Sequence, residues 1–151
     1  MNKKKISWCL KKKNGIEIIE IKQHLSESYI KEAEETLENM FATKGKWKVI
    51  IAYYAGYNAL YSILMRCGIK CEIHDCTIEL MDLFGFDKKE IIHIKKLKDD
   101  RINTQYYLKD IILKDEIKVK EFVSKCKKIL SSLNSQKIEL IRNQIKEVSD
   151  E

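Results

Sequence analysis

The segment from Val49 to Met65, VIIAYYAGYNALYSILM, constrains the fold of this chain more than any other. It carries no charged residue, although 34% of the whole chain is Asp, Glu, Lys or Arg. An apolar run of this length has to be buried, and its four tyrosine hydroxyls then need hydrogen-bond partners. We therefore expect it to form the central helix of a helical bundle.

The composition favours a single, mainly α domain over residues 1–151. The chain has no proline and only 5 glycines, and its apolar residues recur at intervals of three and four, the pattern of long amphipathic helices. The formal net charge is +6, from 29 Lys and Arg against 23 Asp and Glu interleaved along the same segments. This bias permits RNA binding without demonstrating it, and most of the charge is expected on a solvated surface.

The central segment approaches the length that spans a bilayer. Its tyrosines and Asn58 would be costly in hydrocarbon, and Lys46, Lys48 and Arg66 flank both ends without the asymmetry that orients a membrane helix. The N-terminal apolar stretch is too short for a secretory signal, and five cysteines fit a reducing compartment. We expect a cytoplasmic protein with no membrane association.

The N-terminal segment 1–22 reads as a β-hairpin. Asn14 and Gly15 separate two apolar stretches, and Asn-Gly is the strongest two-residue signal for a type I′ turn. Because a lone hairpin is marginal in water, Trp8, Leu10 and Ile16 are expected to pack on the helices.

Capping signals divide the rest of the chain into helices. Ser26 is a suitable N-cap, Asp87 with Glu90 resembles a capping box, and Asp115 opens a long charged helix. The predicted helices cover about 27–44, 47–67, 74–84, 88–98 with an extension into 101–108, and 116–133, followed by a helical arm or interface segment over 135–151.

One cluster has metal-ligand chemistry: Cys67, Cys71, His74 and Cys76. Structural zinc sites use close pairs of cysteines or histidines, whereas this spacing straddles a helix end, a turn and a helix start. Cysteine also packs as a small hydrophobe, which is the interpretation adopted for Cys67, Cys71 and Cys76, with zinc and disulfide chemistry as alternatives. No phosphate-binding glycine loop is present, so neither a metal nor a cofactor is expected.

Four short motifs together resemble one family. They are YYAGYNALY at 53–61, Gly-Ile-Lys at 68–70, EIHDCTIE at 72–79, and an arginine at 101 followed by Tyr-Tyr at 106–107. In this order they resemble HEPN domains, in particular small archaeal stand-alone members, over Trp8 to about Leu133. The resemblance implies a four- or five-helix up-and-down bundle, usually a homodimer, often paired with a minimal nucleotidyltransferase in a toxin–antitoxin system.

Many HEPN proteins are metal-independent ribonucleases whose signature is an arginine, four to six residues, then a histidine. Arg101 matches the arginine, but the histidine positions hold Tyr106, Tyr107 and Leu108. A histidine with a reference pKa near 6.5 moves protons at neutral pH, whereas tyrosine, near 10, stays protonated. His93 lies eight residues upstream, roughly 12 Å along one helix, and could act only from a second subunit or after a helix break.

The resulting hypothesis is a dimer that binds RNA or a nucleotide at a polar groove around Arg101, with weak or absent ribonuclease activity. Arg101 and Tyr106 are the catalytic candidates, and Gln105, Tyr107 and Asn58 are further binding candidates. The alternative function is a non-catalytic partner of a nucleotidyltransferase, with Tyr106 or Tyr107 as a modification target.

Structural alternatives stay open for three of these positions. Arg101 could instead form a surface ion pair with Asp99 or Asp100, one of the two adjacent tyrosines could be a core residue, and His74 could simply bond at the entry of its helix.

Overall fold

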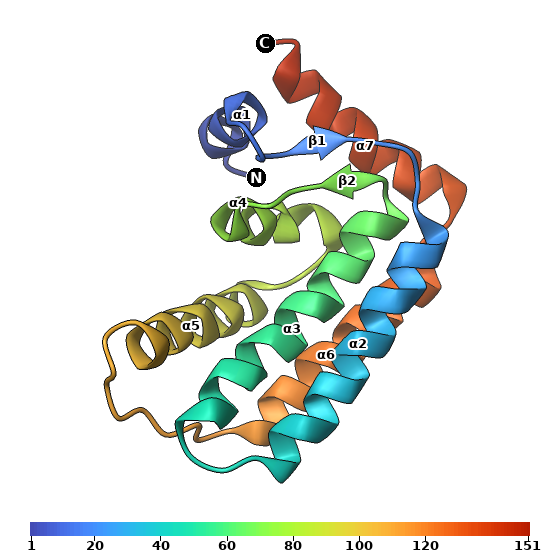
Figure 1. The fold of residues 1–151 in the computed structure, drawn as a ribbon. Helices are drawn as coiled ribbons and strands as arrows, with labels where there is room; N and C mark the ends of the chain where they lie inside the picture. Colours follow the sequence, from blue (N-terminus) through green and yellow to red (C-terminus); the bar gives the residue numbers. More distant parts are fainter.

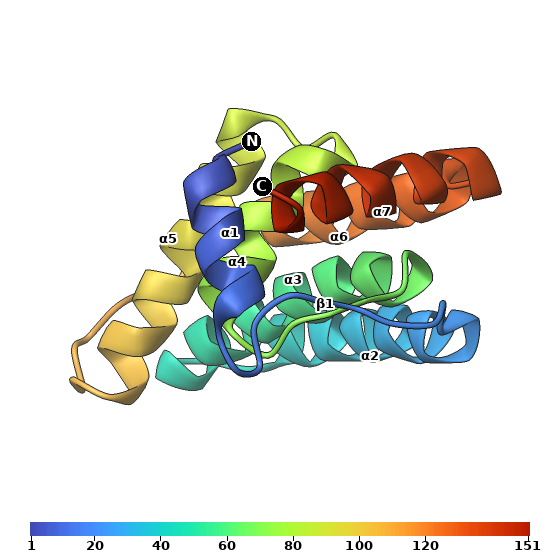
Figure 2. The same cartoon turned by 90° about the horizontal axis from the view of Figure 1, so that it is seen from above.

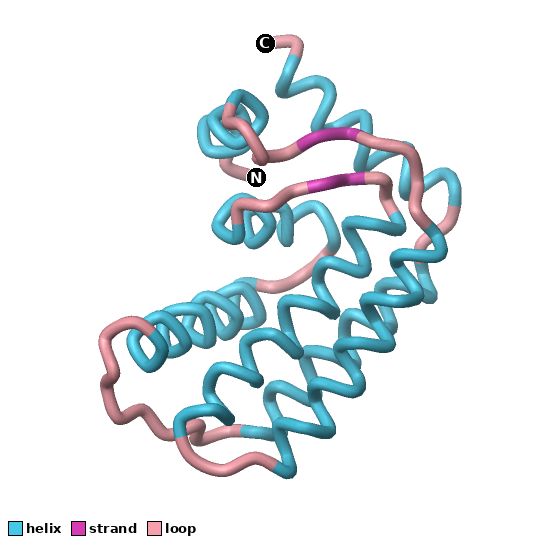
Figure 3. Tube along the Cα trace, in the orientation of Figure 1, coloured by secondary structure: helices cyan, strands magenta, loops and turns pink.

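The computed structural model describes residues 1–151 as a mainly helical structure, as the composition predicts (Figure 1, Figure 3). The α-helices are α1 (Lys3–Lys11), α2 (Gln23–Ala42), α3 (Lys46–Arg66), α4 (His74–Glu79), α5 (Lys88–Gln105), α6 (Glu116–Ser132) and α7 (Ser135–Ser149). A 3₁₀ helix, η1 (Leu80–Phe84), continues α4. Two short strands, β1 (Glu17–Ile18) and β2 (Ile69–Lys70), pair antiparallel, with Glu17 opposite Lys70.

Helix α3 is the centre of the fold, as its apolar sequence predicts. Every residue from Val49 to Met65 is buried except Ile51, Tyr54 and Asn58. Helices α2, α5 and α6 pack against it (Figure 1). The helix ends before Gly68, whose φ of +68° is the left-handed conformation that glycine adopts without strain. No helix combines the length and apolarity that crossing a bilayer requires.

A glycine on α3 lets α5 approach closely. A Cβ added to Gly56 would lie 2.9 Å from Cδ1 of Ile94, so a larger side chain would require the Ile94 side chain to move. The N-terminus of α5 is fixed by the predicted capping box, in which Asp87 accepts from the backbone of Glu90 and the Glu90 side chain accepts from the backbone of Asp87. The helix runs to Gln105, confirming the extension past Lys98.

The N-terminal hairpin prediction is wrong. Residues 3–11 form helix α1, capped by Asn2, and the strand that follows pairs with β2 rather than with the N-terminus. Asn14 has the expected positive φ, +63°, but Gly15 serves a different purpose: a Cβ there would lie 1.9 Å from the carbonyl oxygen of Cys9. The Asn-Gly pair therefore turns the chain back over the end of a helix, and Trp8 is exposed rather than packed.

Ser26 is not the N-cap of the first long helix. Helix α2 begins one turn earlier, at Gln23, and Ser26 lies inside it, buried, with its hydroxyl donating to the carbonyl of Ser62 at 2.7 Å. The signal was misleading because a serine can satisfy its hydroxyl against a neighbouring helix as well as at a helix end. Asp115 does cap α6, accepting from the backbone of Lys118.

The C-terminal segment is a helix, α7, and it contributes to the core. Its isoleucines at 138, 141 and 145 are buried. Arg142 donates to the carbonyls of Ile19, Cys67 and Gly68 at 2.8–2.9 Å, where α3 has ended and its last carbonyls lack helical partners. Seen from above, α7 and α6 form a layer over α3 and α2 (Figure 2). The predicted apolar surface on this segment is therefore largely used within the chain.

A disulfide bond joins Cys9 of α1 to Cys76 of α4. The packing interpretation of Cys76 is thus wrong, and it could not be corrected from the sequence because Cys9 lies 67 residues away. Cys67 and Cys71 are free and buried, as the packing interpretation predicts. The bond holds α1 against α4.

Reduction of this bond should destabilise the protein. Closing a loop of this length restricts the unfolded chain by roughly 4 kcal/mol in the chain-entropy model. Chemical denaturation with and without reductant should therefore show a lower midpoint in the reduced protein. A Cys9→Ala/Cys76→Ala variant should not respond to reductant. Alkylation of all five cysteines in denaturant without reductant would contradict the bond.

Candidate functional site

Arg101 is a buried residue that faces α3. Its side chain and backbone together are only 8% exposed. Nη1 donates to the hydroxyl of Tyr54 at 3.2 Å and to Oε1 of Gln105 at 3.4 Å. The guanidinium carbon lies 5.0 Å from the ring centroid of Tyr53, 5.5 Å from that of Tyr54 and 5.9 Å from that of Tyr106. Three aromatic rings and an amide thus surround the cation.

The charge of Arg101 has no carboxylate partner. Asp100 pairs with Lys96 at 2.8 Å, and Asp75 pairs with Lys98 at 2.7 Å; no acidic residue forms an ion pair with Arg101. Its Nε is buried without any hydrogen-bond partner. The predicted surface ion pair with Asp99 or Asp100 is therefore absent. A buried cation without an anion is energetically costly, and such a group favours binding of a negatively charged ligand.

His74, the first residue of α4, adjoins this cation. Its Nδ1 is hydrogen-bonded to the hydroxyl of Tyr53 at 2.7 Å, and its ring stacks on Tyr57 with centroids 4.0 Å apart. Burial, followed by the charges of Arg101 and Lys98, lowers the pKa of His74 below its usual value. The imidazole is therefore neutral at pH 7. His74 therefore forms a hydrogen bond at the start of its helix, as one alternative predicted, and its partner is the Tyr53 side chain of α3.

A groove of about 570 Å³ opens beside Tyr54, between α2, α3 and the segment that joins β2 to α4. Its aromatic and amide lining includes Tyr29, Tyr54, Tyr57, Asn58, Tyr61 and His74. Tyr54 belongs both to this groove and to the surroundings of Arg101. Asn58 is half-buried, and its amide makes no hydrogen bond within the protein.

The structure brings together most of the predicted site residues. Gln105 lies beside Arg101 at the end of α5, as its four-residue spacing predicts. Tyr106, the C-cap of α5, also contacts the guanidinium, although helical spacing places it about 140° further round. Asn58 lines the adjoining groove one helical turn from Tyr54. Tyr107 makes no recorded hydrogen bond or ring contact. The expectation that one of the two adjacent tyrosines is a core residue is wrong, because Tyr106 is 65% and Tyr107 68% exposed.

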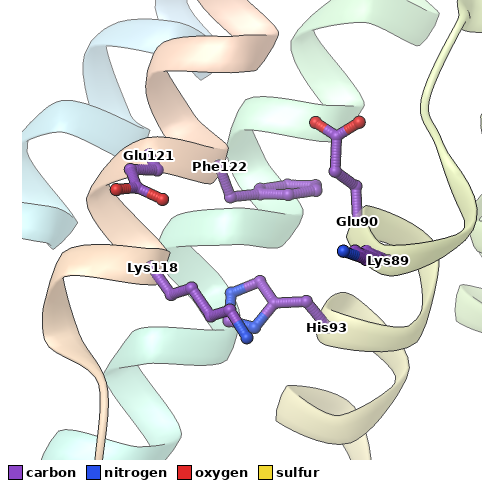
Figure 4. Close-up of a pocket in the computed structure, with 6 residues that line it drawn as sticks. All are labelled: Lys89, Glu90, His93, Lys118, Glu121 and Phe122. Carbon is purple, nitrogen blue, oxygen red and sulfur yellow. The ribbon is translucent and has the colours of Figure 1, made fainter.

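His93 faces away from this site. It points from α5 toward α6 into a small hollow with Lys118 and Phe122 (Figure 4). Its Nε2 is buried without a partner, and burial and the charge of Lys118 lower its pKa. α5 is unbroken between His93 and Arg101, so within one chain His93 does not replace the missing motif histidine.

The cysteine cluster does not assemble as a metal site. Cys76 is bonded to Cys9, and no group of three or more His, Cys, Asp or Glu residues lies in a metal-binding arrangement. Burial raises the pKa of Cys67 to about 12 and also raises that of Cys71. Both thiols therefore stay protonated at neutral pH, whereas metal ligation requires the thiolate.

Two contributors to the site were not predicted as binding residues: Tyr54 and His74. Both lie in the sequence motifs at 53–61 and 72–79, but helical periodicity alone does not say which tyrosine of a buried helix faces a cation. Compared with known proteins, the sequence matches no family model and no curated protein.

The electrostatic coupling between Arg101 and His74 can be measured. Replacing Arg101 by Gln removes a nearby positive charge that disfavours the imidazolium, so the pKa of His74 should rise. Titration of the histidine ring protons by NMR would show this shift. His93 is the internal control, since the cations that affect it are Lys118 and Lys96. Equal shifts of both histidines, or none, would contradict the assignment.

Proposed function

We propose that the protein binds RNA or a nucleotide through a phosphate group at Arg101. The observation that carries this proposal is the buried guanidinium with no carboxylate partner and an unbonded Nε. A phosphate supplies the missing negative charge, and guanidinium–phosphate bonds are short and charge-assisted. Gln105 and Tyr54 hold the guanidinium in place through Nη1.

The HEPN resemblance supports the same function, and Arg101 is its motif arginine. A helical bundle with a central tyrosine-rich helix is consistent with that family. On this proposal the protein acts as a homodimer in the cytoplasm and belongs to a toxin–antitoxin-like pair. The Cys9–Cys76 disulfide runs against the reducing-compartment argument from the cysteines, because such bonds are rare in a reducing cytosol. The dimer rests on the resemblance, because the apolar residues of the C-terminal segment largely pack inside the chain.

Binding is favoured over cleavage at this site. Tyr106 is close enough to Arg101 to hydrogen-bond a shared phosphate, but a tyrosine phenol is a poor general base at neutral pH. His74 is mainly neutral at pH 7, but it lies at the start of α4 and not four to six residues after Arg101, where the motif histidine stands. Ribonuclease activity is therefore weak or absent in the native sequence.

The alternative function, a non-catalytic partner of a minimal nucleotidyltransferase, is favoured by the segment between α5 and α6. Tyr106, Tyr107, Leu108 and Ile112 are 65–80% exposed, an unusual accumulation of large apolar side chains on a short segment. The two tyrosine hydroxyls are accessible to a modifying enzyme. This segment would form the contact with the partner protein.

Replacing Arg101 by Ala should weaken the binding of single-stranded RNA without unfolding the bundle. Charge-assisted hydrogen bonds contribute about 1.5–3 kcal/mol, so the dissociation constant should rise roughly 10- to 100-fold. Fluorescence anisotropy at several salt concentrations measures this, and the salt dependence should be shallower in the variant.

Arg66→Ala is the matched control, because it removes the same charge from α3 at a position without a side-chain hydrogen bond or ion pair. Arg66→Ala should retain near-native binding. Melting curves should show that the native protein, Arg101→Ala and Arg66→Ala are all folded. Equal loss of affinity in both variants would indicate nonspecific attraction and contradict the Arg101 site.

Tyr106→His should produce metal-independent RNA cleavage. The substitution restores an arginine, four residues and a histidine, with a general base whose pKa suits neutral pH. Cleavage of a labelled RNA in the presence of EDTA measures the gain. Lys109→His, which leaves seven residues after Arg101 and so falls outside the signature, is the control for the spacing and should not cleave. Strong cleavage by the native protein that survives Arg101→Ala would show that the active site lies elsewhere.

A further inference from the structure

We infer that the tyrosine-lined groove beside Arg101 binds one unpaired nucleobase of the ligand whose phosphate Arg101 holds. This inference rests on the proposed function and specifies its ligand: a nucleoside phosphate with a free base, either a mononucleotide or a single-stranded RNA position. The groove is the hollow of about 570 Å³ between α2, α3 and the β2–α4 segment.

Two side chains of the groove wall, Tyr54 and His74, connect the groove to Arg101, which is not itself part of the lining. Tyr54 accepts a hydrogen bond from Arg101 at 3.2 Å and also lines the groove. His74 lines the groove as well and shares the contact with Tyr53, whose ring lies under the guanidinium. The inference therefore places the phosphate at Arg101 and the aromatic ring in the groove, on either side of these shared side chains.

Arg101 differs from the lysines on the groove rim in having no acidic partner. The rim lysines Lys22 and Lys70 pair with Glu20 and Glu72, each at 3.8 Å. Arg101, by contrast, has no acidic partner. The phosphate is therefore placed at Arg101 and the uncharged part of the ligand in the groove.

The lining suits an aromatic heterocycle better than an aliphatic chain. Tyr61, Tyr57 and His74 form a stacked series, with centroids 5.9 Å and 4.0 Å apart. Tyr29 and Tyr54 are half-buried, so part of each ring is accessible for stacking. Burial raises the pKa of Tyr57 and of Tyr61, so these hydroxyls stay uncharged and the walls do not repel an anionic ligand.

Two polar groups in the groove can form hydrogen bonds with the edge of a base. The Asn58 amide makes no hydrogen bond within the protein, and an amide offers both a donor and an acceptor. Nδ1 of His74 is occupied by Tyr53, whereas its Nε2 has no protein partner. Neither group is needed for the fold, which leaves both for a ligand.

Single-stranded binding follows from the same geometry. The bases of a duplex are stacked and paired, and they would have to be unpaired to enter a groove between two helices.

The experiment is isothermal titration of the full chain at low salt with ribose 5-phosphate, adenosine, the four nucleoside 5′-monophosphates, and single-stranded and duplex RNA of one sequence.

At least one nucleoside monophosphate should bind roughly 10- to 100-fold more tightly than ribose 5-phosphate, the gain expected from stacking one base. Asn58→Leu should reduce this advantage, because it weakens the nucleotide more than it weakens ribose 5-phosphate. Asn39→Leu, an exposed asparagine of α2 outside the groove, is the matched control.

The outcomes separate the two proposals. If ribose 5-phosphate binds as tightly as every nucleotide and Asn58→Leu changes nothing, the groove does not bind a base, although Arg101 still holds phosphate. Adenosine binding as tightly as its monophosphate, or duplex RNA as tightly as the single strand, would also overturn the inference. Binding of none of these ligands would overturn the proposed function itself.

Discussion

Four tyrosine hydroxyls on one buried helix have to find hydrogen-bond partners, and the arrangement around α3 follows from this requirement. Tyr53 bonds to His74, Tyr57 to Thr77, and Tyr61 accepts from the backbone of Cys71. These three bonds fix the β2–α4 segment on α3. Tyr54 instead accepts from Arg101 and so attaches α5. An unpaired buried hydroxyl would cost about 1–3 kcal/mol, so the four tyrosines favour the placement of the β2–α4 segment and of α5 against this helix.

Within this network, Arg101 is the residue whose charge has no acidic partner and whose Nε has no hydrogen-bond partner. Its stacking on aromatic rings offsets part of the cost of burial, by about 0.5–2 kcal/mol for each good contact. The remaining charge and the unbonded Nε are features that a protein selected only for stability would not retain. This is the physical reason to regard the site as functional, and it does not depend on the family resemblance.

Much of the fold could be predicted from the sequence because its main helices carry strong local signals. The sequence correctly predicted the approximate bounds of α3, the capping box at Asp87 and the cap at Asp115. The prediction for the N-terminus was wrong because Asn-Gly is equally suited to a left-handed exit from a helix. The place of α1 depends on contacts distant in sequence, with α7 and with α4, which include the disulfide to Cys76. In the site, the helical spacing of Arg101 and Gln105 sufficed, whereas the roles of Tyr54 and His74 depend on contacts between helices.

The most direct test of the central claim observes the guanidinium of Arg101 itself. The chain has arginines only at 66, 101 and 142, so their Nε–Hε signals can be assigned in an NMR spectrum by substitution. On titration with pyrophosphate, the Arg101 signal should move in a saturable way while that of Arg142, bonded to three carbonyls, stays fixed. If the Arg101 signal stays unchanged throughout the titration, Arg101 is not the anion site.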